Sequence, residues 1–165
     1  MTPKTYLSWN DVEKHVNNLA VQLYRDNWKP DYIVGLHSGG NIPATMLAKM
    51  LNIPSYSLDV RLRDGTDGPE SNAWMAEDAY NFKKILVVDD INDTGATINW
   101  LKNDWPASAL PLDPRWFKIW GDSVRFAVLI NNEASRADVN YSACDINKAE
   151  KDEWIVFPWE EWWCK

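Results

Sequence analysis

The chain has 165 residues, 45% hydrophobic and 25% charged, a balance that is typical of one folded domain and excludes a disordered chain. Its net charge of −7 argues against a nucleic-acid-binding protein, because phosphates require clustered Lys and Arg. No apolar run approaches the ~20 residues of a membrane span, and residues 1–14 lack the apolar core of a signal peptide, so we expect a cytoplasmic protein without membrane contacts.

Hydrophobic periodicity predicts helices that alternate with short buried strands. In chain order, the predicted elements are a helix at 8–27, a strand at 32–36, a helix at 41–51, strands at 56–60 and 84–89, a helix at 95–102, and strands at 124–130, 139–143 and 153–157. Residues 61–80 and 106–121 are predicted to be irregular, and the first of these segments is long enough to be a functional lid or a disordered segment. This order predicts an α/β fold with a mainly parallel, twisted sheet flanked by helices, in which ligands bind at the carboxyl ends of the strands.

The most informative segment follows the predicted strand at 84–89. Asp89 and Asp90 stand at its end, and Asp93 follows on the turn. The next helix then begins with small and hydroxyl side chains, Thr94, Gly95, Ala96 and Thr97. Open amides at a helix N-terminus bind phosphate, and nearby carboxylates suit sugar hydroxyls and a bridging Mg²⁺. The motif therefore predicts a site for a phosphorylated sugar and a metal ion, with a plain acidic turn that caps the helix as the structural alternative.

Other phosphate motifs do not match. The P-loop pattern GxxxxGK[ST] and the dinucleotide pattern GxGxxG are both absent. Instead, VVDDINDTGAT resembles the phosphoribosyl-pyrophosphate signature of the type I phosphoribosyltransferases. IVGLHSGGNIPATMLAKML resembles the strand and helix around the pyrophosphate loop of that family, and WIVFPWE resembles the C-terminal base-binding hood of its short xanthine-guanine branch. The resemblance covers roughly residues 8–160 and implies one domain over 1–165, with a flexible lid at about 61–80 and a hood at about 131–165.

The resemblance implies a Mg²⁺-dependent enzyme that salvages a purine base (hypoxanthine, guanine or xanthine) with phosphoribosyl pyrophosphate as the second substrate. Asp89 and Asp90 would hold the ribose hydroxyls directly or through the metal, and Asp93 would exchange a proton with the base nitrogen. The 5′-phosphate would be bound by Asp93, Thr94, Gly95, Ala96 and Thr97. The pyrophosphate would be approached by the backbone amides of Ser38, Gly39 and Gly40.

The base itself is assigned to the hood. Trp154 is the candidate stacking platform, although core packing is the alternative for any single tryptophan among the eleven in this chain. Ile155 would offer backbone groups to the edge of the base. Asn131 stands where the family places a recognition lysine, and an asparagine can read either a 6-oxo or a 6-amino group. The pattern does not assign Lys148 to the site, and it predicts that Arg136 is a solvent-facing loop residue.

One departure from the family keeps other functions open. The pyrophosphate loop of the family usually carries a basic residue, as in SRGG or LKGG, and here Ser38 takes that position, with His37 as a weaker substitute. The missing charge favours an alternative in which the chain is a non-catalytic sensor of phosphoribosyl pyrophosphate or a nucleotide. A transferase that acts on a pyrimidine or a non-base acceptor is a third hypothesis. Small members of the family are dimers or tetramers, so we expect a homodimer or a homotetramer.

Overall fold

The main sheet is entirely parallel. A computed structural model describes residues 2–60, 73–110 and 112–160 of the chain. Its larger sheet has five strands in the order β3-β2-β4-β5-β6, and all of its pairings are parallel. These strands are β3 (Ser55–Asp59), β2 (Tyr32–His37), β4 (Ile85–Asn92), β5 (Val124–Asn132) and β6 (Tyr141–Ile146). The predicted α/β fold with a mainly parallel sheet is confirmed.

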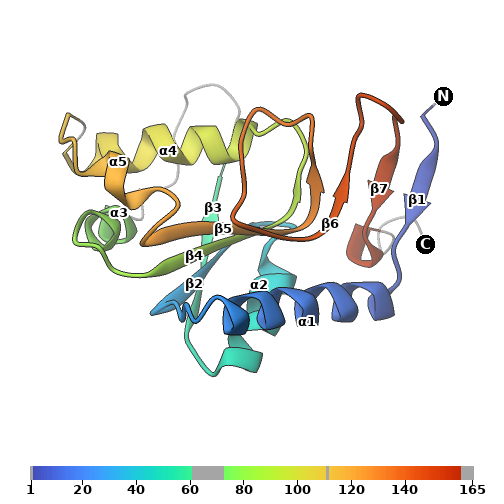
Figure 1. The fold of residues 1–165 in the computed structure, drawn as a ribbon, viewed down its shortest axis with the longest axis horizontal. Coiled ribbons are helices and arrows are strands. Elements are labelled where there is room, and N and C mark those ends of the chain that lie inside the picture. The colour runs from blue at the N-terminus through green and yellow to red at the C-terminus, as the bar shows by residue number, and fades with distance from the viewer. Residues whose placement is uncertain (1, 61–72, 111, 161–165) are drawn as a thin grey trace.

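Helices cover both faces of this sheet (Figure 1). One layer consists of α1 (Trp9–Arg25) and α2 (Asn41–Leu51). The opposite layer consists of α3 (Ala73–Tyr80), α4 (Ala96–Ser108) and α5 (Trp116–Ile119). The two faces of β4 alternate between the two cores, with Val88 packed toward the first layer and Val87 toward the second. This two-sided burial explains why the strand is apolar on both faces.

Local sequence signals set the ends of the helices. At the start of α1, Ser8 and Asp11 form a capping box in which the Ser8 backbone N–H donates to Asp11 Oδ2 (2.8 Å) and the Asp11 N–H donates to Ser8 Oγ (3.1 Å). At the end of α2, Asn52 adopts the left-handed conformation (φ 54°) that terminates a helix. Both helices match the predicted ranges to within two residues at their ends. No helix in the described ranges is long and apolar enough to span a membrane.

A second, smaller sheet joins the two ends of the described chain. The strands β1 (Lys4–Tyr6) and β7 (Trp154–Val156) pair in parallel, with Thr5 opposite Ile155. They lie beyond β6 at one side of the main sheet (Figure 1). Because Ile155 is buried in the core under α1, this small sheet holds the C-terminal segment against the rest of the fold.

Several predicted boundaries were wrong. Residues 73–80 are not irregular but form α3, because Met75, Ala76 and Ala79 are buried against the sheet. The rest of the predicted lid, residues 61–72, lies outside the described residues. The segment 106–121 also contains regular structure: α4 continues to Ser108 through Pro106, and α5 follows. Trp105 is 1% exposed and stacks on Trp120 with 6.1 Å between the ring centres, and this burial outweighs the helix-breaking tendency of the proline.

Candidate active site at the carboxyl ends of the strands

The turn from β4 to α4 contains the residues that the sequence motif predicts to bind phosphate. Gly95 precedes the helix with φ +89°, a conformation that favours glycine. A Cβ at Gly95 would lie 2.6 Å from the backbone nitrogen of Ala137 and 2.8 Å from Ser135 Oγ. Thr94 Oγ1 accepts a hydrogen bond from the Ala96 N–H (3.2 Å). The turn therefore packs tightly on one side against residues 135–137 and leaves the start of α4 open on the other.

The two carboxylates that precede the turn lie within β4 rather than at its end. The strand continues to Asn92 because its ladder with β5 continues through the pairs Ile91–Ile130 and Asn92–Asn131. The Asp90 N–H donates to Asp89 Oδ1 (2.8 Å), and the Ile91 N–H donates to Asp90 Oδ1 (2.7 Å). These bonds fix the two carboxyl groups beside each other.

Burial dominates the electrostatics of this pair. It raises the pKa of Asp89 well above its ordinary value, and the neighbouring Asp90 charge raises it further. Burial also raises the pKa of Asp90. Within the described ranges, no three His, Cys, Asp or Glu side chains converge on one point. A site with two adjacent carboxylates fits Mg²⁺, which commonly takes one or two protein carboxylates together with substrate phosphates and water.

The loop after β2 lies directly against Asp90. A Cβ at Gly39 would overlap Asp90 Oδ2, and a Cβ at Gly40 would overlap the carbonyl oxygen of Val88. The peptide bond between His37 and Ser38 is cis. The predicted pyrophosphate-binding residues and one of the predicted ribose-binding carboxylates are thus neighbours, as parallel strands with adjacent carboxyl ends require.

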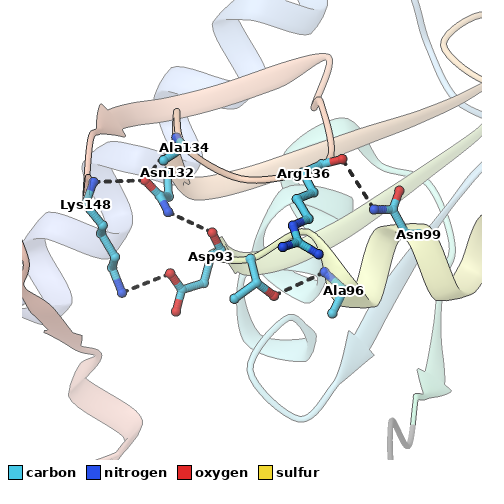
Figure 2. A pocket seen from close by; sticks show the side chains of 8 residues that line it. Asp93, Ala96, Asn99, Asn132, Ala134, Arg136 and Lys148 are labelled. Carbon is cyan, nitrogen blue, oxygen red and sulfur yellow. Dashed lines mark hydrogen bonds and ion pairs between the residues drawn. The ribbon is translucent and has the colours of Figure 1, made fainter. Parts of the chain in front are cut away.

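A cavity of about 590 Å³ opens beside the β4–α4 turn (Figure 2). Its lining comes from the turn, from the start of α4 and from the segments that follow β5 and β6. The lining residues are Asp93, Thr94, Ala96, Asn99, Asn132, Ala134, Arg136 and Lys148. A space of this size accommodates a small ligand.

Lys148 connects the turn to the predicted base platform. Its Nζ lies 3.0 Å from Asp93 Oδ1 and 5.9 Å from the centre of the Trp154 ring. Its backbone N–H donates to Asn132 Oδ1 (3.0 Å), and Asn132 Nδ2 in turn donates to the carbonyl oxygen of Asp93 (2.8 Å). Trp154 is 55% exposed. Asp93, the predicted proton-transfer group, and Trp154, the predicted stacking ring, therefore both lie near the Lys148 ammonium group.

The other two predicted base-binding residues are engaged elsewhere. Asn131 Oδ1 accepts from Asn92 Nδ2 (2.9 Å), and Asn131 Nδ2 donates to Asp145 Oδ1 (3.3 Å). Asn131 is not among the residues that line the cavity, whereas its neighbour Asn132 is. The side chain of Ile155 is buried in the core, so only its backbone remains available to a ligand.

Sequence reasoning missed Asn132, Arg136 and Lys148, which all line the cavity. Arg136 had been expected to be a loop residue that faces solvent; it is indeed exposed, but its side chain extends over the pocket toward Ala96 (Figure 2). One usable signal was that Asn132 is the last residue of β5 and Arg136 follows it, at the same edge of the sheet as the carboxyl end of β4. Lys148 follows β6 in the same way.

Comparisons with known proteins agree with this geometry. A family model described as a phosphoribosyl transferase domain matches residues 3–163. Over 187 residues, the chain is 22% identical to xanthine phosphoribosyltransferase 1 of Saccharomyces cerevisiae, covering 95% of this chain and 90% of that protein. Over 189 residues, it is 24% identical to hypoxanthine-guanine phosphoribosyltransferase of Schizosaccharomyces pombe, covering 95% and 89%. The crystal structure of purine phosphoribosyltransferase from Pyrococcus horikoshii matches with a TM-score of 0.70 and 28% identity, covering 96% of this chain and 95% of that one.

Proposed function

Because the chain belongs to the phosphoribosyl transferase domain family, we propose that it transfers the 5-phosphoribosyl group of phosphoribosyl pyrophosphate to a purine base and releases pyrophosphate. Relatives that are similar over nearly the whole chain bear the names of purine phosphoribosyltransferases. The observation that carries the proposal is the position of Asp93. Asp93 stands on the β4–α4 turn and forms an ion pair with Lys148, and the Lys148 ammonium group lies near the Trp154 ring.

In the proposed reaction, the bond between the ribose C1 and the pyrophosphate oxygen breaks, and pyrophosphate leaves with the bonding electrons. A lone pair of the base nitrogen forms the new bond to C1, and the proton of that nitrogen passes to the Asp93 carboxylate. The ion pair with Lys148 uses Asp93 Oδ1 and leaves Oδ2 to accept the proton. The base would stack on Trp154, which is exposed enough to receive it.

Asp89 and Asp90 would hold the ribose hydroxyls and one Mg²⁺ ion. When bound, the metal would supply positive charge that stabilises the departing pyrophosphate. The raised pKa values of the two carboxyl groups support this assignment, because a cation relieves the cost of burying two adjacent negative charges.

The donors around the base favour a 6-oxopurine. Lys148 can only donate hydrogen bonds, so it suits a carbonyl oxygen at the edge of the base and does not suit a 6-amino group. Its Nζ is already held between Asp93 and the Trp154 ring. Hypoxanthine, guanine and xanthine all carry the 6-oxo group and adenine does not, so we place the first three among the acceptors.

The test is pyrophosphate release from phosphoribosyl pyrophosphate and Mg²⁺, with hypoxanthine, guanine, xanthine, adenine, uracil and orotate offered separately. We expect release with one or more 6-oxopurines and none with adenine. Release only with uracil or orotate would contradict a purine acceptor. No release with any base, from protein that binds phosphoribosyl pyrophosphate in calorimetry, would favour the sensor role that the uncharged Ser38 suggests.

Self-association is part of the same proposal. Trp9 and Trp74 are each more than 40% exposed in the single chain, and exposed aromatic surface of this kind commonly marks a contact between subunits. Sedimentation equilibrium should give a mass of two or four chains. A monomer at micromolar concentration would contradict the expected homodimer or homotetramer.

A further inference from the structure

The side chain of Arg136 has no assigned role, although it lines the cavity beside the phosphate turn. Figure 2 shows it extending toward Ala96, at the start of α4. Among the residues that the structure describes, no carboxylate forms an ion pair with its guanidinium group. An arginine that faces a cavity without a partner is suited to bind an anionic ligand group.

The backbone of Arg136 is fixed to the phosphate turn. Its N–H donates to the carbonyl oxygen of Thr94 (2.9 Å), and its own carbonyl oxygen accepts from Asn99 Nδ2 (3.3 Å). These two bonds attach Arg136 to both sides of Gly95, whose missing Cβ leaves room for the close approach of Ala137. The backbone of Arg136 is therefore held against the turn rather than on an independent loop.

A buried asparagine reinforces this attachment. Asn92 is 3% exposed, and its Nδ2 donates to the carbonyl oxygen of Ala137 (2.8 Å). Ser135 Oγ donates to Asn92 Oδ1 (2.9 Å). Asn92 thus holds the residues on each side of Arg136 to the end of β4. A segment connected in this way moves with the turn, so the arginine is preorganised for a ligand bound there.

The charges of the cavity favour an anion near Arg136. Among the residues that the structure describes, the lining contains one acidic side chain, Asp93, and two basic ones, Lys148 and Arg136. Asp93 and Lys148 pair with each other at 3.0 Å. Among these described residues, the charge of Arg136 is then uncompensated, and Figure 2 shows Arg136 on the side of α4, away from Lys148. A phosphate at the start of α4 would gain its charge-assisted hydrogen bonds.

We propose that Arg136 binds the 5′-phosphate of the phosphoribosyl substrate and of the nucleotide product, closing the phosphate cradle from the β5–β6 connection. This inference rests on the proposed function, because it assigns a residue of the same site to one end of the same ligand. It predicts that Arg136 distinguishes a nucleotide from the corresponding nucleoside. It also predicts no contribution from Arg136 to the binding of free pyrophosphate, which would occupy the β2–α2 loop.

The experiment measures the affinities of inosine 5′-monophosphate, inosine and pyrophosphate by calorimetry for the wild type, Arg136→Gln and Arg136→Lys. For Arg136→Gln, we expect binding of the nucleotide to weaken by about tenfold to a hundredfold, the range of a lost charge-assisted contact. Binding of inosine and of pyrophosphate should be unchanged. Arg136→Lys should recover part of the loss. Arg25→Gln, which changes an exposed arginine at the end of α1, is the matched control and should bind all three ligands as the wild type does.

Two results would overturn the inference: equal weakening of nucleotide and nucleoside, which would place Arg136 at the base or ribose, or weakening of pyrophosphate alone. Turnover of the wild type is measured in parallel and tests the proposed function separately. A wild type that prefers the nucleotide to inosine, loses that preference in Arg136→Gln and transfers no base would support the role of Arg136 while contradicting catalysis. An active wild type whose preference for the nucleotide survives in Arg136→Gln would support catalysis and contradict the role of Arg136.

Discussion

The two turns that form the site, from β2 to α2 and from β4 to α4, are built on the same plan but are charged differently. Each leads from a parallel strand into a helix, and each uses glycine where a Cβ would collide with a neighbouring segment. The β4–α4 turn receives two basic residues from later in the chain, since Lys148 pairs with Asp93 and Arg136 is bound to Thr94. The β2–α2 turn, HSGGN, contains no Lys or Arg of its own.

This difference indicates that the shape and the charge of these turns come from different parts of the chain. A turn supplies shape through its own residues, because glycine and small side chains determine how closely a ligand can approach. The positive charge comes from basic residues elsewhere in the chain that the fold places beside the turn, here Lys148 and Arg136. The β4–α4 turn should therefore dominate ground-state binding of the sugar phosphate, and the β2–α2 turn should bind pyrophosphate through backbone amides and the metal.

The largest expected effect is at Asp93, the proposed proton acceptor on the β4–α4 turn. Asp93→Asn removes the proton acceptor but keeps an oxygen that can pair with Lys148. We expect kcat to fall by about 10²- to 10⁴-fold, the usual contribution of a general acid or base. The affinity for phosphoribosyl pyrophosphate should change little. Steady-state pyrophosphate release and calorimetry with the unreacted substrate measure the two quantities.

The control is Asp122→Asn, which changes an exposed aspartate (79% exposed) beside Arg125, outside the cavity lining. It should leave both quantities unchanged. Wild-type turnover in Asp93→Asn would remove this residue from the mechanism, and the comparison between the two turns would then concern binding alone.

The next effect concerns shape. Gly95 and Gly121 have similar positive φ angles of 89° and 82°, but only Gly95 is crowded, whereas a Cβ at Gly121 would meet its nearest neighbour, Asn140 Nδ2, at 3.6 Å. Gly121→Ala should therefore lower the free energy of unfolding by about 1–2 kcal/mol, the backbone cost alone. Gly95→Ala should lower it by about 1–3 kcal/mol more, because Ala137 must shift. Urea denaturation of the two variants gives the difference, and equal losses would contradict tight packing behind the turn.

The shape of the site could be predicted from the sequence, and its charge could not. Asp89 to Thr97 lie on one strand end and one helix start, so their chemistry is visible in a single stretch of chain. Lys148 and Arg136 reach the same turn only because β5 lies beside β4 and β6 lies beside β5 in the sheet. Nothing in their local sequence marks them, since each stands in a polar segment that resembles any exposed connection.

A similar limit applies to the fold. The strongly periodic elements, such as α1 and the buried strands β2 and β4, were predicted because each buries a full face or both faces. The helix α3 was missed because its short apolar pattern follows a long polar stretch, and only contacts with the sheet reveal that Met75 is buried. The strand β1 was missed because all three of its residues are exposed and it exists only through its pairing with β7.

A third prediction tests whether the β2–α2 turn is limited by its missing charge. Ser38 is exposed, and Ser38→Arg adds a guanidinium that can reach the pyrophosphate. We expect the KM for phosphoribosyl pyrophosphate to fall by about tenfold or more, since one charge-assisted contact contributes about 1.5–3 kcal/mol. Added salt should reduce the gain. Ser55→Arg places the same charge at the opposite end of the sheet, at the start of β3, and should leave KM unchanged; an equal gain there would indicate general attraction only.

The smallest effect is expected at His37, the remaining candidate for a basic group on this turn. Asn41 Nδ2 and His37 Nδ1 lie within hydrogen-bond distance (2.9 Å), so this ring nitrogen is engaged within the turn and only Nε2 is left for a ligand. His37→Ala should therefore raise the KM for phosphoribosyl pyrophosphate by only about two- to tenfold, the range of one neutral hydrogen bond. His15→Ala, which changes the other of the two histidines in the chain, is the control. A rise in KM well above tenfold for His37→Ala alone would mean that this turn does carry a cation, and the contrast between the two turns would no longer hold.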